Sequence, residues 1–224
     1  MSISSTVLVA GYGPLKNNSV NPAWETARRL DGKIVRGAKV TALQVPANIR
    51  KNLEIIETEI VRCKPSVIIG LGLAPGRAVL TLERSGLNIL DFPYEDVKKN
   101  QPMGEPVVSG GPSAYLTTIP IKAILKRMRE AGIPSAISYT AGTHGCNQIL
   151  YWMLHYVSIR NLSIKVGFIH LPYLPEQIAR MWEGSPYMYQ PSMSLELMTG
   201  GTEIAIETSL ELTGDIEMGS GALC

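Results

Sequence analysis

Apolar residues along this chain follow two spacings, one typical of buried strands and one typical of amphipathic helices. Short continuous runs such as Val67-Ile68-Ile69 predict strands that are buried on both faces. Elsewhere, apolar residues recur at helical spacing, for example at Ile49, Leu53, Ile56 and Ile60. We therefore expect strands at 6–10, 39–45, 66–72, 136–140 and 164–169, and helices at 22–30, 47–63, 120–132, 147–157 and 176–182.

Capping residues mark several of the predicted helix ends. Asn21 precedes Pro22, a pair typical of an N-cap followed by the first helical position. Gly132 closes the helix that Pro120 opens. The segment 194–212 is ambiguous, because Gly200-Gly201 interrupts an apolar spacing that otherwise permits a helix.

Alternating strands and helices predict the fold class: a three-layer α/β sandwich with a mainly parallel, twisted sheet. The length of 224 residues fits a single domain spanning 1–224. In such sheets, ligands bind beyond the carboxyl ends of the strands. Four segments follow predicted strands and are expected to meet at that edge: Gly11-Tyr12-Gly13, Gly72-Leu73-Ala74, 141–146 and His170.

The stretch from Asp91 to Pro112 lacks apolar periodicity and is rich in proline, glycine and charge. A connection of this length in a compact domain is usually a functional loop or a mobile segment. We expect one of these two here.

Composition and charge narrow the class of protein. Hydrophobic residues make up 45% of the chain, which supports a substantial core, and the net charge of +2 comes without a basic cluster. We therefore expect no nucleic-acid partner. No apolar run is long enough to span a bilayer, and the start of the chain lacks a secretion signal, so we expect a cytoplasmic protein. The three cysteines are widely spaced and predict no disulfide framework.

Cys146 is the strongest candidate for a catalytic residue. It stands on a glycine-bearing turn between a predicted strand and an apolar helix. Free backbone N–H groups and the helix dipole favour a thiolate at such a position and can hold an oxyanion. A cysteine that serves only in packing has no need of this placement.

A nucleophilic cysteine needs a base and a group that orients the base. His170 ends a buried strand and is favoured over His144, because residues two apart on a turn often point away from each other. His155 lies within the apolar helix and is expected to serve in packing or a surface contact. The spacing does not identify the acid, which leaves four alternatives: Glu83, Asp91, Glu95 and Asp96.

Other motifs give weaker signals. The glycines at 11 and 13 and those at 70, 72 and 76 each follow a strand, but neither set matches the dinucleotide fingerprint, and no phosphate-binding Gly-Lys-Ser/Thr occurs. His144, Cys146 and His170 lack the paired spacing of a metal site. We expect neither a cofactor nor a metal.

Several short motifs occur along the chain in an order that, taken together, is characteristic of one protein family. They are Gly11-Tyr12-Gly13-Pro14 before Asn21-Pro22-Ala23-Trp24-Glu25, Leu71-Gly72 with Gly76-Arg77, Glu83-Arg84 with Asn88, Asn100-Gln101-Pro102, Ala141-Gly142-Thr143 with Cys146-Asn147, and Gly167-Phe168-Ile169-His170 with Pro172-Tyr173-Leu174-Pro175-Glu176-Gln177. With them, the chain resembles the pyroglutamyl peptidase I family of cysteine peptidases, from Thr6 to Leu210.

The resemblance implies an enzyme that removes N-terminal pyroglutamyl residues from peptides through a thioester. The residues that match the family's nucleophile, base and acid are Cys146, His170 and Glu83. The family further implies a phosphorylase/hydrolase-like fold, a peptide substrate with a blocked N-terminus, no cofactor, and a cytosolic homo-oligomer, often a tetramer.

The residues that match the family's pocket depart from its usual pattern. Two phenylalanines of the first loop become Tyr12 and Leu15, and a glutamine becomes Leu73. The aromatic and aliphatic residues before the nucleophile become His144 and Gly145, and the loop from Asp91 lacks an arginine. We expect the pocket to be lined by Tyr12, Leu15, Asn21, Leu73, His144 and Gly145.

These departures leave two alternatives open beside strict pyroglutamyl specificity. One is a related cysteine amidohydrolase that acts on a different small amide or lactam. The other is a non-enzymatic binding protein that keeps the fold.

Overall fold

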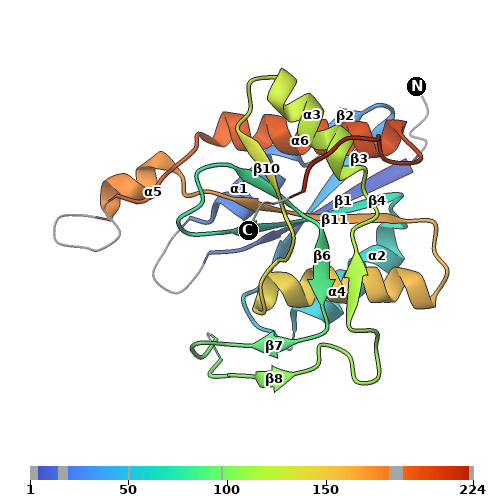
Figure 1. Ribbon diagram of the computed structural model, residues 1–224, viewed down its shortest axis with the longest axis vertical. Helices are drawn as coiled ribbons and strands as arrows, with labels where there is room; N and C mark the ends of the chain where they lie inside the picture. The colour runs from blue at the N-terminus through green and yellow to red at the C-terminus, as the bar shows by residue number, and fades with distance from the viewer. Residues whose placement is uncertain (1–4, 15–19, 50, 97, 182–188, 222–224) are drawn as a thin grey trace.

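A seven-stranded sheet forms the centre of the computed structural model, which describes residues 5–14, 20–49, 51–96, 98–181 and 189–221. The strand order is β10-β5-β11-β4-β1-β3-β2 (Figure 1). Its strands are β1 (Ser5–Tyr12), β2 (Ile34–Val35), β3 (Ala38–Val45), β4 (Val67–Leu73), β5 (Leu80–Glu83), β10 (Ser135–Ser138) and β11 (Lys165–Leu171).

The sheet is mixed but mostly parallel, so the predicted α/β class is confirmed. Strands β3, β1, β4 and β11 are parallel and form its buried centre. Beyond them, β5 runs antiparallel to β11, and β10 runs parallel to β5. At the other edge, the short β2 is antiparallel to β3. The carboxyl ends of the four central strands therefore meet the amino end of β5 at one edge.

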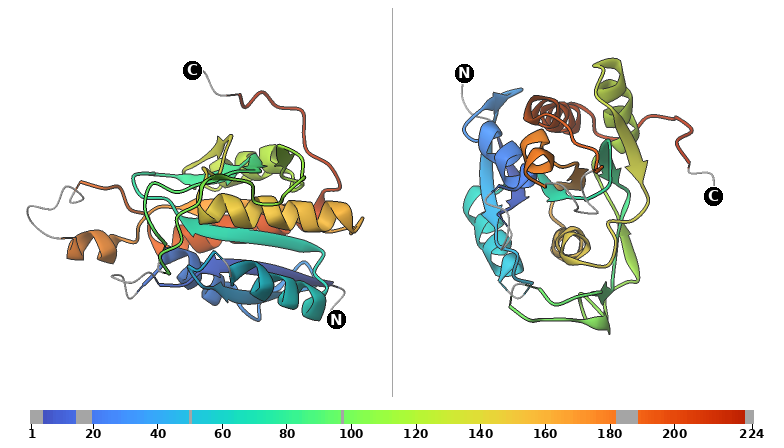
Figure 2. Two further views of the ribbon diagram at one scale, coloured as in Figure 1. Left: turned by 90° about the horizontal axis from the view of Figure 1, so that it is seen from below. Right: turned by 90° about the vertical axis from the view of Figure 1, so that its left-hand side faces the viewer.

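Helices cover both faces of the sheet and create two cores. One core joins alternate strand residues to α1, α3 and α6, and the other joins the remaining strand residues to α2 and α4. Figure 2 shows these layers from two further sides. The helices are α1 (Pro22–Leu30), α2 (Asn52–Cys63), α3 (Ile121–Glu130), α4 (Gly145–Ile159), α5 (Pro175–Arg180) and α6 (Leu195–Glu211).

Most predicted helices form within a few residues of their expected bounds. Asn21 caps α1 as predicted, because its side chain accepts a hydrogen bond from Ala23 N at 3.0 Å. Helix α2 begins at Asn52 and not at residue 47, so Ile49 lies in the preceding loop. Helix α5 ends at Arg180, and its expected end at Trp182 lies outside the described residues.

The ambiguous segment 194–212 forms one helix, α6, in spite of its two glycines. A Cβ atom at Gly201 would lie 2.3 Å from Leu80 Cδ1. The glycine therefore lets α6 approach the sheet closely, and packing outweighs the low helix propensity of glycine.

The region 80–116 contains structure that the apolar pattern did not predict. Besides β5, it forms two small antiparallel pairs, one of which carries the expected loop away from the main sheet. Strands of two or three residues are too short to show a period, which hides them from a periodicity argument. They are β6 (Ser85–Leu87) with β9 (Ala114–Leu116), and β7 (Leu90–Asp91) with β8 (Met103–Glu105).

Within the described part of the chain, no helix has both the length and the apolar character needed to cross a membrane.

Candidate active site

Three in-register positions form a row at the carboxyl edge of the central strands. His170 on β11 lies beside Gly72 on β4. On the other side of β4, Gly11 lies beside Leu71, so the next residue, Tyr12, is the neighbour of Gly72. Because adjacent in-register residues share a face, the side chains of Tyr12 and His170 stand on either side of a position without a side chain.

The sulfur of Cys146 occupies the gap in this row. A Cβ atom at Gly72 would lie 2.7 Å from Cys146 Sγ and 3.0 Å from the ring of Phe168. Glycine at position 72 is therefore required for the thiol to sit against the sheet. The segment predicted to converge at this edge does so, although it arrives from β10, which runs against the central strands.

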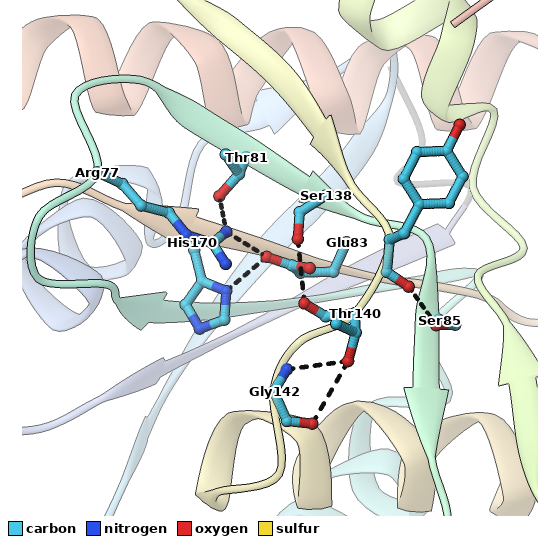
Figure 3. Close-up of polar contacts among 9 residues, drawn as sticks. Arg77, Thr81, Glu83, Ser85, Ser138, Thr140, Gly142 and His170 are labelled. Carbon is cyan, nitrogen blue, oxygen red and sulfur yellow. Dashed lines mark hydrogen bonds and ion pairs between the residues drawn. The ribbon is translucent and has the colours of Figure 1, made fainter. Parts of the chain in front are cut away.

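A tight turn delivers Cys146 to this position. Gly142 adopts a φ of 81°, a conformation that favours glycine. Its N–H donates to Thr140 Oγ1 at 3.1 Å, as drawn in Figure 3. Helix α4 then begins at Gly145, so Cys146 lies in the first turn, where backbone N–H groups lack partners within the helix. These N–H groups and the helix dipole favour negative charge at the sulfur.

His170 is held by a completely buried carboxylate. Its Nδ1 lies 2.7 Å from Oε1 of Glu83, whose side chain is 0% exposed. The guanidinium of Arg77 donates to the same oxygen at 2.6 Å and also to Thr81 Oγ1. Figure 3 shows Arg77 and His170 approaching Glu83 together. Since Nδ1 faces the carboxylate, Nε2 remains available to Cys146, whose sulfur acts electrostatically on His170.

The surroundings of His170 favour its charged form. Burial by itself would lower its pKa, but the adjacent sulfur of Cys146 and the Glu83 carboxylate outweigh burial and raise the pKa to about 9. An imidazolium beside a sulfur, oriented by a carboxylate, is the charge arrangement that activates a cysteine nucleophile.

The other carboxylates considered in the sequence have different surroundings. Asp96 accepts hydrogen bonds from the backbone and side chain of Asn100 and from Lys98 N, which organise its own loop. Asp91 is exposed in β7, and its N–H donates to Thr143 O at 3.0 Å. Glu95 lines the pocket described next.

A pocket of about 230 Å³ opens beside Cys146. Five of the six residues expected to line it do so, and the sixth, Leu15, lies outside the described residues. Seven further lining residues were not expected, since they come from loops and from the start of α2. The expected residues are Tyr12, Asn21, Leu73, His144 and Gly145, and the others are Ala47, Ile49, Asn52, Pro75, Tyr94, Glu95 and Asp96.

His144 forms part of this pocket and stacks on Phe92, with ring centroids 3.7 Å apart. Burial lowers its pKa, although the charge of Asp96 acts in the opposite direction. Its Nε2 is buried and has no hydrogen-bond partner among the described residues. A neutral imidazole with an unused polar atom is available to a bound ligand.

His155 contacts Tyr115, whose hydroxyl lies 3.0 Å from His155 Nδ1. Its ring also lies against the rings of Tyr115 and Tyr151, so packing, one of the two expected roles, is what the structure shows.

Asn147 is a structural residue of the site that the apolar pattern did not reveal. Its buried side chain accepts from Leu87 N at 2.7 Å and donates to Leu87 O and Ile89 O, both at 2.9 Å. It thereby ties the start of α4 to the segment between β6 and β7. A polar side chain in an otherwise apolar helix was the available signal.

The glycines of the two weak nucleotide motifs have packing roles. A Cβ atom at Gly11 would lie 2.4 Å from Ala23 O, and one at Gly70 would lie 2.4 Å from the Phe168 ring. Gly11 lets α1 lie against β1, and Gly70 leaves room for the ring of Phe168, its neighbour on β11. Among the described residues, no group of three or more His, Cys, Asp or Glu side chains is arranged to hold a metal ion.

An α/β sandwich with a cysteine at a helix start beside a carboxylate-bound histidine defines the class of cysteine hydrolases. Residues 5–212 match the model of the pyroglutamyl peptidase family, and the chain belongs to this family.

Individual relatives agree over almost the whole chain. Pyrrolidone-carboxylate peptidase 1 of Ralstonia nicotianae is 40% identical over 218 residues, which cover 97% of this chain and 99% of the relative. A pyrrolidone-carboxylate peptidase of Bacillus cytotoxicus is 42% identical over 94% of this chain and 95% of its own. The crystal structure of pyroglutamyl peptidase I from Bacillus amyloliquefaciens is 38% identical, with a TM-score of 0.90 over 98% of this chain and 100% of that one.

We expect Gly72→Ala to displace the sulfur of Cys146. The added methyl group would overlap Sγ at 2.7 Å, so either the thiol or the Phe168 ring must move. Alkylation of Cys146 by iodoacetamide, followed by mass spectrometry, should slow at least fivefold, and overpacking should lower the free energy of unfolding by about 1–3 kcal/mol.

Gly214→Ala is the matched control, because a Cβ atom there meets nothing within 4 Å. Equal alkylation rates in Gly72→Ala and the wild type would show that the gap at position 72 does not place the thiol.

Proposed function

We propose that this protein is a cysteine peptidase that removes N-terminal pyroglutamyl residues from peptides. The observation that carries the proposal is the contact of Glu83 with His170 next to Cys146, in a chain of the pyroglutamyl peptidase family. Relatives named pyrrolidone-carboxylate peptidase support the same substrate class. The alternatives of a different lactam substrate and of a non-enzymatic binding protein are not favoured by these relatives.

In the proposed first step, the thiolate of Cys146 attacks the carbonyl carbon that follows the pyroglutamyl ring. The sulfur forms a bond to carbon, and the π electron pair of the carbonyl moves onto its oxygen. Backbone N–H groups at the start of α4 stabilise this oxyanion. When the C–N bond breaks, His170 gives its proton to the departing amine, which leaves a pyroglutamyl thioester on Cys146.

In the second step, neutral His170 accepts a proton from water, and the resulting hydroxide attacks the thioester. The collapse of this intermediate releases pyroglutamate and regenerates the thiolate beside the imidazolium. Glu83 orients His170 throughout and stabilises its charged form. Arg77 supports this role, because it neutralises a carboxylate that is 0% exposed.

The pocket beside Cys146 is proposed to hold the pyroglutamyl ring. Its small volume of about 230 Å³ suits a five-membered lactam better than a long side chain. Tyr12, Leu73 and His144 offer flat or apolar contact, and Asn21 and Gly145 complete the wall. Leu15 is included by its match to the family pattern.

The proposal extends to assembly and location. Resemblance to the family supports a homo-oligomer, and a tetramer in particular, in the cytoplasm. Cys63 and Cys146 are free thiols, which agrees with a reducing compartment. The molar mass from light scattering tests the assembly, since a monomer at micromolar concentration would contradict a tetramer.

A fluorogenic assay tests the activity. Pyroglutamyl-aminomethylcoumarin should release coumarin, whereas alanyl and prolyl analogues should react at least a hundredfold more slowly. Cys146→Ala should abolish the release, and Cys63→Ala, which changes the other described thiol, should leave it unchanged. Release from every analogue would contradict pyroglutamyl specificity, and release by Cys146→Ala would contradict the nucleophile.

The raised pKa of His170 predicts how activity depends on pH. The imidazolium that protonates the leaving amine is present below a pKa of about 9 and is lost as the pH rises through it. The kcat/KM of the wild type should therefore fall above about pH 9. Glu83→Gln removes a charge that raises the pKa, so the fall should move to lower pH, and kcat/KM at neutral pH should drop by on the order of 10².

Glu57→Gln is a suitable control, because Glu57 pairs with Arg160 on the surface. The assigned role of Glu83 would be wrong if Glu83→Gln lowered kcat/KM equally at all pH values without moving the alkaline limb.

A further inference from the structure

The hydroxyl of Tyr12 reaches the start of α4 through space that Gly145 leaves open. A Cβ atom at Gly145 would lie 2.7 Å from Tyr12 Oη, well inside contact distance. Any larger residue at position 145 would therefore push the phenol away from the residue that precedes Cys146. The two residues are sterically complementary.

Among the described residues, the Tyr12 hydroxyl accepts a hydrogen bond but donates none. Asn52 Nδ2 donates to Tyr12 Oη at 3.4 Å and to Gln148 Oε1 at 3.0 Å. Gln148 in turn donates to Ile49 O at 2.9 Å. Because Asn52 supplies the proton in its contact with the phenol, Tyr12 can still donate its own. In the described part of the chain, no acceptor takes that proton, and Tyr12 lines the pocket where a ligand would bind.

The local electrostatics keep this phenol protonated. Burial raises the pKa of Tyr12 well above its usual value, and the nearby charge of Cys146 raises it further, against a smaller opposing effect of Asn52. Tyr12 therefore keeps its proton at neutral pH and can serve as a hydrogen-bond donor. It stands on the opposite side of Gly72 from His170, so that the phenol and the base flank the sulfur.

Building on the proposed function, we propose that Tyr12 donates a hydrogen bond to the oxygen of the carbonyl that Cys146 attacks. As the S–C bond forms, the π pair of the carbonyl moves to oxygen beside the free N–H groups of α4 and the Tyr12 hydroxyl. The phenol keeps its proton throughout. When the leaving group departs with its bonding pair, the C=O bond re-forms and the hydrogen bond weakens. Tyr12 is thus a transition-state donor that acts together with the helix start.

The test compares two reactions of the same sulfur in the wild type and in Tyr12→Phe. Acylation by p-nitrophenyl acetate passes through an oxyanion, and its burst of nitrophenolate gives the rate. Alkylation by iodoacetamide displaces iodide in one step and forms no oxyanion. Cys146→Ala supplies the background for both, and Tyr115→Phe, which removes a phenol bonded to His155 instead, is the matched control.

We expect acylation in Tyr12→Phe to slow by about tenfold to a hundredfold, while alkylation changes less than twofold. With the pyroglutamyl substrate, kcat should fall by a similar factor at nearly constant KM. Equal slowing of acylation and alkylation would overturn the proposal, because the hydroxyl would then act on the thiolate or on the fold. A raised KM with unchanged kcat, or no change in acylation, would overturn it too, as would the absence of Cys146-dependent acylation in the wild type.

Gly145→Ala provides a second variant, since its methyl group displaces the phenol without removing it. It should reproduce the selective loss of acylation, and in the Tyr12→Phe background it should add less than twofold. The ester assay does not depend on recognition of a lactam. A selective loss of acylation without any cleavage of pyroglutamyl substrates would therefore refute the proposed function and leave the role of Tyr12 intact.

Discussion

A completely buried carboxylate must be paired, and the pairing of Glu83 organises this protein around one charged cluster. Removing an ion from water costs several kcal/mol unless hydrogen bonds and an opposite charge replace the solvent. Glu83 receives both from Arg77 and His170, which approach the same oxygen at 2.6 and 2.7 Å. The register of β5 matters here, because β5 runs against β11 with Thr81 opposite His170, and Glu83 lies two residues further along on the same face.

The same cluster connects the two layers of the site. His170 belongs to the sheet and Cys146 belongs to α4, and Gly72 is the contact point that lets them meet. A side chain at position 72 would push the thiol of Cys146 away from the imidazole of His170, the proposed nucleophile and base. The proposed chemistry thus depends on the missing side chain of Gly72 as well as on Cys146, His170 and Glu83.

The sequence predicted the central fold because long buried strands and amphipathic helices leave clear apolar spacings. It did not predict β5 or the strands of the 91–112 segment, since elements of two to four residues produce no period. The start of α4 was readable from the glycines before Cys146. The contact between His170 and Glu83 was not, because 87 residues separate them and the spacing alone left four carboxylates equivalent. Their pairing was implied only by the family motifs.

The lining of the pocket, too, could be predicted from the sequence only in part. Tyr12 and Gly145 stand 133 positions apart in the printed sequence, and an apolar pattern relates only residues within one helix or strand. Their steric fit becomes visible only when β1 and α4 are placed together. Loop residues such as Ile49 and Tyr94 line the pocket because of the route that their loops take. The spacing of apolar residues does not predict that route.

Asn147 links the movement of α4 to that of the neighbouring segment 87–89. Its side chain bonds to the backbone at residues 87 and 89, and a Cβ atom at Gly86 would lie only 2.7 Å from the α4 backbone at Tyr151. The start of α4 therefore cannot move away from residues 87–89 without breaking these hydrogen bonds. Amide exchange at Leu87 would report the disengagement of α4 itself, because the proton of that amide is held by the residue next to Cys146.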